Sequence, residues 1–177
     1  MIKVVKFGGS SLASAEQFHK VKDIILSDPD RRFVVPSAPG KRDSSDTKVT
    51  DMLYHCYSIA EENGDFSEAL AQIRARYQEI IDGLSLTVSL DGEFETIREN
   101  FAAHAGRDYA ASRGEYLNGI LIANYLGFEF IDSARYIRFL EDGTFDAKTT
   151  QDLLSEVLKN LDNAVIPGFY GAYADGR

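Results

Sequence analysis

Two apolar segments on either side of an amphipathic one occupy the first 36 residues, and this order restricts the fold more than any other feature of the chain. Residues 2–7 have the composition of a strand and end at two glycines. The segment Ser14–Gln17 has the spacing of a capping box, and apolar residues follow it at helical intervals. Residues 32–35 form a second apolar run. A strand, a helix and a strand in this succession predict a right-handed parallel crossover.

The remainder of the chain continues this alternation of elements. Helices are expected where apolar residues recur with helical spacing, at 49–62, 66–82, 94–105, 113–125 and 150–161. Short strands are expected at 128–132 and 164–171, with a further extended piece at 134–140. Because strands alternate with helices, the sequence predicts an α/β fold with a mainly parallel sheet.

The composition fits one soluble globular domain or the larger part of one. The chain has 177 residues, of which 44% are apolar and 27% charged. No apolar run approaches the roughly 18 to 20 residues that span a bilayer, so no membrane association is expected. The single cysteine, Cys56, cannot form an intrachain disulfide, which favours the reducing cytoplasm.

Charge and histidine content exclude two classes of function. The formal net charge of −9 argues against a nucleic-acid surface, which needs clustered positive charge, but it leaves room for a locally held phosphate. The three histidines are scattered, so no protein metal site is expected.

Small or polar residues follow each expected strand, in the segments Gly8–Ser11, Ser37–Gly40, Asp132–Ser133 and Gly168–Gly171. Ligands of open parallel sheets bind beyond the carboxyl ends of the strands. A strand that turns through glycines into a helix also presents backbone N–H groups to an anion. The pattern therefore predicts a ligand site at this edge of the sheet.

Lys6, two residues before the glycines, has two interpretations. It is either a solvated strand residue, as Lys3 would be, or a cation suited to stabilising a transferring phosphoryl group. The spacing alone does not choose between them. The diglycine turn matches neither a Walker A loop nor the G-x-G-x-x-G pattern, which disfavours P-loop and Rossmann nucleotide binding.

Glu115 and Thr50 also have two interpretations. Glu115 is expected in the first turn of a helix that opens near Ser112, where the helix macrodipole favours a carboxylate. Thr50 is likewise a capping residue in the first instance. The alternative places both in the site, with Glu115 holding an ammonium group. The residues by themselves favour the structural interpretation, and they lead only to an α/β protein that binds a small anionic ligand.

Several segments, taken in order, resemble one family. Residues 4–11 read VVKFGGSS and resemble the K-F-G-G-[ST]-S signature of aspartate kinases, within the wider amino-acid kinase family. Residues 34–40, VVPSAPG, followed by KVTD at 48–51, resemble its V-V-x-S-A segment and later Thr-[Asn/Asp]. Residues 112–115, SRGE, match its S-x-G-E, and VIPGFYG at 165–171 matches its V-x-x-G-F-x-G strand.

This resemblance implies the three-layer α/β/α amino-acid kinase fold and transfer of the ATP γ-phosphoryl group to the β-carboxylate of L-aspartate, the first step toward lysine, threonine and methionine. ATP would be the co-substrate, with Mg²⁺ carried by the nucleotide, and the intact enzyme would be a cytoplasmic homo-oligomer. The implied site residues are Lys6 as the catalytic cation, Lys6, Phe7, Gly8, Gly9 and Ser10 around the phosphates, and Ser37, Thr50, Glu115 and Phe169 around aspartate.

The family pattern continues, after the last strand, into S-R-G-G-S-D, a nucleotide-binding half and ACT domains, none of which follows Ala174–Arg177 here. Residues 1–177 are therefore expected to be an N-terminal, substrate-binding lobe that is inactive by itself. Two alternatives stay open: a stand-alone, non-catalytic module that binds a small anion or a partner, and an amino-acid kinase for another acid. The long segment between Gly40 and Thr50 and the loosely matching Asp132 receive no prediction.

Overall fold

The computed structural model describes residues 1–176, and Arg177, the last residue of the expected hairpin segment, lies outside them. The chain forms an α/β structure whose elements are β1 (Lys3–Phe7), the 3₁₀ turn η1 (Gly9–Leu12), α1 (Ala15–Leu26), β2 (Arg31–Pro36), α2 (Val49–Glu61), α3 (Ser67–Gly83), α4 (Asp91–Ala102), α5 (Arg107–Leu126), β3 (Glu129–Phe130), η2 (Ser133–Arg135), β4 (Arg138–Phe139), α6 (Ala147–Leu158), β5 (Ala164–Val165) and β6 (Ala172–Tyr173).

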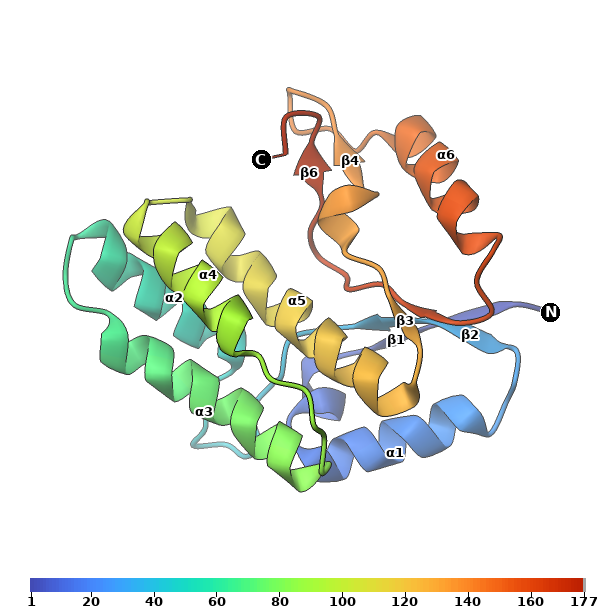
Figure 1. Ribbon diagram of the computed structural model, residues 1–177, viewed down its shortest axis with the longest axis horizontal. Helices are drawn as coiled ribbons and strands as arrows, with labels where there is room; N and C mark the ends of the chain where they lie inside the picture. Colours follow the sequence, from blue (N-terminus) through green and yellow to red (C-terminus); the bar gives the residue numbers. More distant parts are fainter. Residues whose placement is uncertain (177) are drawn as a thin grey trace.

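The main sheet has four parallel strands in the order β1-β2-β5-β3. Val5 lies beside Val34 across β1 and β2, and Val34 lies beside Val165 across β2 and β5. A second parallel pair, β4 with β6, stands apart from this sheet at the top of Figure 1. The parallel crossover expected from the first 36 residues is confirmed, with Ser14 capping α1 by accepting from the backbone N–H of Gln17 at 3.4 Å.

Side-chain alternation along the strands separates two apolar layers. Val34 and Val165 point into the larger core, together with the buried faces of α1 and α5. Phe33 and Ala164 point to the opposite face, where α6 supplies Val157, among others. Figure 1 shows the sheet nearly edge-on, with α1 below it and α6 above it. Helices thus cover both faces, as the three-layer fold requires.

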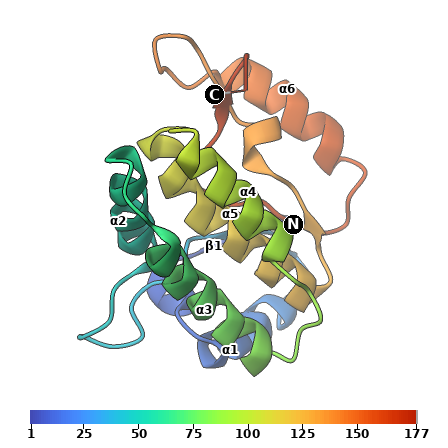
Figure 2. The same cartoon turned by 60° about the vertical axis from the view of Figure 1, so that its left-hand side comes forward.

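Helices α2, α3 and α4 extend away from the sheet and pack around the first half of α5 (Figure 2). Aromatic rings fill the space between them: Tyr77 contacts Phe94 with ring centroids 6.1 Å apart, and Tyr57 meets Phe101 edge-on at 5.3 Å. Burial of rings of this size supplies a large share of the hydrophobic stabilisation. The larger core is therefore continuous from the sheet into the helical part.

Helix α5 begins six residues before the expected start, so the placement of Glu115 in a first helical turn is wrong. The helix starts after Gly106, whose φ of +104° lies in a region that few residues other than glycine adopt. Gly114 lies in the middle of the helix, where an added Cβ would stand 2.7 Å from the Cβ of Ala38. In the sequence this glycine suggests the start of a helix, but the structure shows that it allows α5 to pack closely against Ala38.

Two other helices begin three residues earlier than the apolar pattern suggested, because their first turns are polar. The first turn of α4 carries Asp91 and Glu93, and Asp146 caps α6 by accepting from the N–H of Thr149 at 3.0 Å. The capping role expected for Thr50 is wrong, since it lies inside α2 and the residue that caps this helix makes no side-chain hydrogen bond.

Candidate functional site

The carboxyl ends of β1 and β2 are joined by two backbone hydrogen bonds, and the candidate site forms around them. The N–H of Ser37 donates to the carbonyl of Phe7 at 3.0 Å, and the N–H of Gly40 donates to the carbonyl of Gly9 at 2.8 Å. These bonds hold the segments Gly8–Ser11 and Ser37–Gly40 side by side, as expected for neighbouring parallel strands.

Both glycines at the point of contact are required by this close approach. A Cβ on Gly9 would stand 2.9 Å from the carbonyl oxygen of Ala38, and a Cβ on Gly40 would stand 2.6 Å from the carbonyl carbon of Gly9. Backbone atoms cannot yield as the end of a flexible side chain can. Any larger residue would therefore separate the two segments.

The diglycine turn leads directly into η1, with Gly8 in extended conformation at its start. The first N–H groups of a helical turn have no intrahelical acceptor, so the turn containing Gly9 and Ser10 can donate to an anion. Lys6 stands beside it: its Nζ lies 3.7 Å from the position that a Cβ on Gly8 would take. The arrangement combines a positive charge with backbone donors at one point of the sheet edge.

Glu115 reaches the same place from α5. Its Oε1 accepts from the N–H of Ala38 at 3.2 Å, while its Oε2 is buried and has no hydrogen-bond partner. The residue is only 7% exposed. Burial raises the pKa of this carboxyl, and the Ala38 N–H and the charge of Lys6 oppose that rise. A buried carboxylate with one open acceptor oxygen is typical of a binding or catalytic position.

Asn118 belongs to the site, although the motif analysis missed it. It lies three residues after Glu115, so both side chains share one face of α5. Its Nδ2 donates to the carbonyl of Ser37 at 2.7 Å, and its fully buried Oδ1 has no partner. The i,i+3 spacing of two polar residues among the apolar and small residues of the buried face of α5 was the signal that could have identified it.

Thr50 is brought to the site by the start of α2. The N–H of Val49 donates to the carbonyl of Pro39 at 3.0 Å, which ties the first turn of the helix to the segment Ser37–Gly40. Thr50 is half-buried there. Thr50 therefore directly follows Val49, whose backbone is hydrogen-bonded to the segment Ser37–Gly40.

Phe169 follows β5 at the same edge of the sheet, where the N–H of Gly168 donates to the carbonyl of Pro36 at 3.4 Å. Its φ of +73° is rare for a bulky residue, and its side chain is 73% exposed. Such strain of about 1–3 kcal/mol persists where the surrounding structure enforces it. The structure thus holds a large ring in solvent beside the site.

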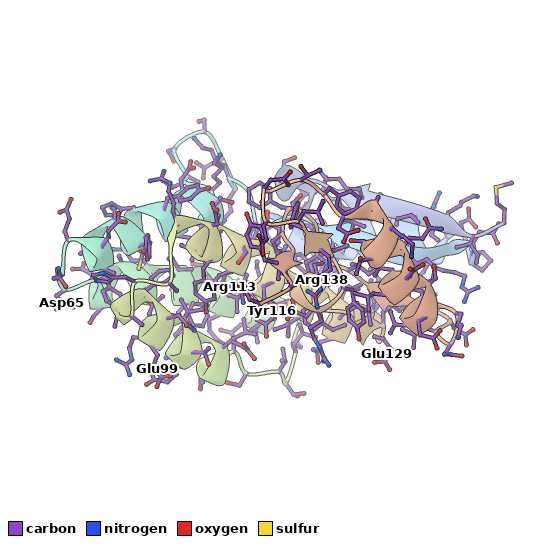
Figure 3. All side chains as sticks on the ribbon, turned by 90° about the horizontal axis from the view of Figure 1, so that it is seen from above. Asp65, Glu99, Arg113, Tyr116, Glu129 and Arg138 are labelled. Atoms are coloured by element: carbon purple, nitrogen blue, oxygen red, sulfur yellow. The ribbon has the colours of Figure 1, made fainter. Side chains whose placement is uncertain are left out.

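A cationic side chain fixes the segment that carries Phe169. The guanidinium of Arg113 lies 4.6 Å from the ring centroid of Tyr109, 4.4 Å from that of Tyr116 and 5.6 Å from that of Tyr170. Figure 3 shows Arg113 and Tyr116 together at the centre of the molecule. The hydroxyl of Tyr170 donates to Asp132 at 2.9 Å, so Asp132 serves as an anchor of this segment.

A hollow of about 550 Å³ lies between α2, α3 and the segment 41–48 rather than over Lys6. Its lining includes Arg42, Asp46, Asp51 and Arg76. Within residues 1–176, no group of three or more His, Cys, Asp or Glu side chains could hold a metal ion. In the same part of the chain, no helix has the length and apolar character needed to cross a membrane.

Comparison with known proteins gives a consistent result. The sequence model of the amino acid kinase family matches residues 1–177. Aspartokinase 3 of Bacillus subtilis is 37% identical over 193 residues, covering 99% of this chain and 42% of the relative. The chloroplastic aspartokinase 1 of Arabidopsis thaliana is 31% identical over 163 residues, covering 85% of this chain and 28% of the relative.

Solved structures agree with these sequence matches. The crystal structure of Clostridium acetobutylicum aspartate kinase superposes with a TM-score of 0.94 at 46% identity, covering 98% of this chain and 40% of that one. Escherichia coli aspartokinase III, solved in complex with aspartate and ADP, shares the fold at 24% identity with a TM-score of 0.81. The chain thus spans about two fifths of the length of the Bacillus, Clostridium and Escherichia proteins.

Proposed function

The chain belongs to the amino acid kinase family, and from this premise we propose that residues 1–177 form the amino-acid-substrate-binding lobe of an aspartate kinase. The reaction is transfer of the γ-phosphoryl group of ATP to the β-carboxylate of L-aspartate, in the pathway to lysine, threonine and methionine. The observation that carries the proposal is the meeting of Lys6, the Gly9–Gly40 contact and the buried Glu115 at one sheet edge. The names of the relatives, all aspartokinases, support the choice of substrate.

The proposed roles follow from the chemistry of each group. Lys6 stabilises charge on the phosphoryl oxygens, and the backbone of Phe7, Gly8, Gly9 and Ser10 donates to the phosphates. Ser37, Thr50, Glu115 and Phe169 surround the amino acid, with the open oxygen of Glu115 accepting from its ammonium group. An ammonium is suited to this oxygen because it supplies both the missing donor and a compensating charge.

Phosphoryl transfer depends mainly on position and charge stabilisation. An oxygen of the substrate β-carboxylate forms a bond to the γ-phosphorus as the bond from that phosphorus to the ADP oxygen breaks. The products are aspartyl phosphate and ADP. Mg²⁺ carried by the nucleotide would neutralise phosphate charge, while Lys6 acts on the transferring group from the β1 side. No general base is needed, because the attacking carboxylate is already ionised at neutral pH.

The experiment is a kinase assay on the full natural protein that contains this chain. ADP formation is followed with ATP and either L-aspartate or L-glutamate, and hydroxylamine traps the acyl phosphate as a hydroxamate. Turnover and hydroxamate with aspartate, and neither with glutamate, would support the proposal. Turnover with glutamate alone would assign another acid, and absence of turnover with both would contradict kinase activity.

A cytoplasmic location belongs to the same proposal and is supported by the free thiol of Cys56.

A further inference from the structure

We propose that Arg76, a buried arginine of α3, is a positioning residue that holds the two glycine segments of the site together. This inference rests on the function proposed above. Arg76 is 4% exposed and lies outside every motif that resembles the family. Its guanidinium donates from Nη2 to the carbonyl of Gly40 at 2.9 Å and from Nη1 to the carbonyl of Ala13 at 3.5 Å.

The two carbonyl acceptors belong to different parts of the site. Ala13 directly follows η1, so its position is coupled to the turn that begins at Gly9. Gly40 ends the other segment and donates its own N–H to Gly9 at 2.8 Å. One planar guanidinium therefore holds the segments Gly8–Ala13 and Ser37–Gly40 together, next to the contact between Gly9 and Gly40. Only arginine has several donors in a rigid fork that can serve two carbonyls at once.

The same guanidinium also anchors the loop that follows Gly40. Arg76 Nη2 lies 3.4 Å from a carboxylate oxygen of Asp46, and the backbone N–H of Arg42 donates to that carboxylate at 2.8 Å. Arg42 also forms an ion pair with Glu79, which lies on the same helix as Arg76. Its Nη1 donates to the Glu79 carboxylate at 2.6 Å. The loop between Gly40 and Val49, whose conformation the sequence did not predict, is thus tied to α3 by charge.

The geometry favours positioning over a purely structural role. The hydrogen bonds of the Arg76 guanidinium go to backbone carbonyls at the site edge, and its ion pair goes to the loop that follows Gly40. Displacement of a catalytic segment by about 1 Å can lower turnover by about 10²-fold. Loss of the guanidinium should therefore lower phosphoryl transfer from ATP more than it lowers the stability of the fold.

The test compares Arg76→Met and Arg76→Lys with a matched control, Arg74→Gln, in the full natural protein. Arg74 lies two residues away on α3, is exposed, and pairs with Asp91 on the surface. Arg76→Met keeps the approximate volume without donors, and Arg76→Lys keeps the charge without the fork. Two quantities are measured: the kinetic constants for ATP and L-aspartate, and hydrogen exchange of backbone amides in residues 8–13 and 37–48.

We expect Arg76→Met to lower kcat/KM for ATP by about 10²-fold, Arg76→Lys to recover part of it, and Arg74→Gln to match the parent. Amides in both segments should exchange faster in the Arg76 variants alone. Parental kinetics and exchange in Arg76→Met, even with a lower Tm, would overturn the inference and leave Arg76 a structural residue. If Arg76→Met does not fold, the same comparison on Arg76→Lys decides. An inactive parent would refute the proposed function instead, and the exchange data would still test Arg76.

Discussion

Replacing Glu115 by glutamine should stabilise the protein at neutral pH while weakening its affinity for the amino acid. The carboxyl is buried, which raises its pKa above the ordinary value of 4.5. A folded-state pKa above the unfolded one means that the folded state binds the proton more tightly. The stabilising contribution of Glu115 is therefore complete below pH 4.5 and is lost as pH rises through the folded pKa. As pH rises, the parent protein therefore comes to carry a buried negative charge whose Oε2 has no hydrogen-bond partner.

The size of the effect follows from the contacts of the two carboxylate oxygens. Oε1 keeps its N–H donor from Ala38, so a glutamine carbonyl can replace it there. At Oε2 neither a carboxylate oxygen nor a glutamine NH₂ has a partner, so the gain comes from removing the buried negative charge, whose incomplete pairing costs about 1–3 kcal/mol. The attraction of Lys6 offsets part of this. We expect a gain of about 1 kcal/mol for Glu115→Gln, or about 2–4 °C in Tm for a domain of this size.

Thermal unfolding of the parent and of Glu115→Gln at pH 4 and pH 7.5 measures this difference. The Tm values should nearly coincide at pH 4, and the variant should unfold at the higher temperature at pH 7.5. Glu16→Gln is the matched control, because Glu16 is an exposed carboxylate paired with Lys20 and should give no gain. An equal or lower Tm for Glu115→Gln at pH 7.5, or a gain that persists at pH 4, would show that the buried charge of Glu115 does not destabilise the protein.

Three further predictions concern other positions. Gly114→Ala should destabilise the protein, because its Cβ would stand 2.7 Å from that of Ala38. The control Gly92→Ala in α4 would meet nothing within 4 Å and should be neutral or stabilising by up to about 1 kcal/mol. Denaturant unfolding measures the stability of both variants. Burial raises the pKa of the Cys56 thiol to about 12, so a thiol reagent at pH 8 should label it only after unfolding; rapid labelling of the native protein would contradict this. Asn118→Ala removes the donor to Ser37 and should raise the KM for L-aspartate by about 3- to 10-fold, with an unchanged KM excluding Asn118 from the site.

The local pattern of the sequence was sufficient for the elements that are defined by their own residues. The crossover from β1 through α1 to β2 follows from alternation, a capping box and helical spacing, and the structure has it at nearly the expected bounds. The start of α5 could not be found in this way. Gly114 resembles a helix boundary in sequence, and only its contact with Ala38, 76 positions earlier, explains a glycine in mid-helix.

The residues of the site also fall into those that local sequence predicts and those that only packing brings together. Gly8, Gly9 and Lys6 lie within one short motif, so their proximity was predictable from the order of residues. Arg76 lies in the middle of a long helix, in a segment without a motif, and reaches Gly40 only because α3 packs against α1 and α2. Side chains that act across such distances in sequence are invisible to periodicity and spacing, because no local rule ties them to the residues they contact.

The most direct test of the central account is the turnover of Lys6→Ala in the full natural protein, measured as ADP formation with ATP and L-aspartate. Lys3→Ala is the matched control: it lies on the same strand, and its ammonium pairs with Asp28 at 2.6 Å, away from the glycines. The account predicts a loss of about 10²-fold or more in kcat for Lys6→Ala, with parental Tm, and parental kcat for Lys3→Ala. Parental kcat in Lys6→Ala would contradict it.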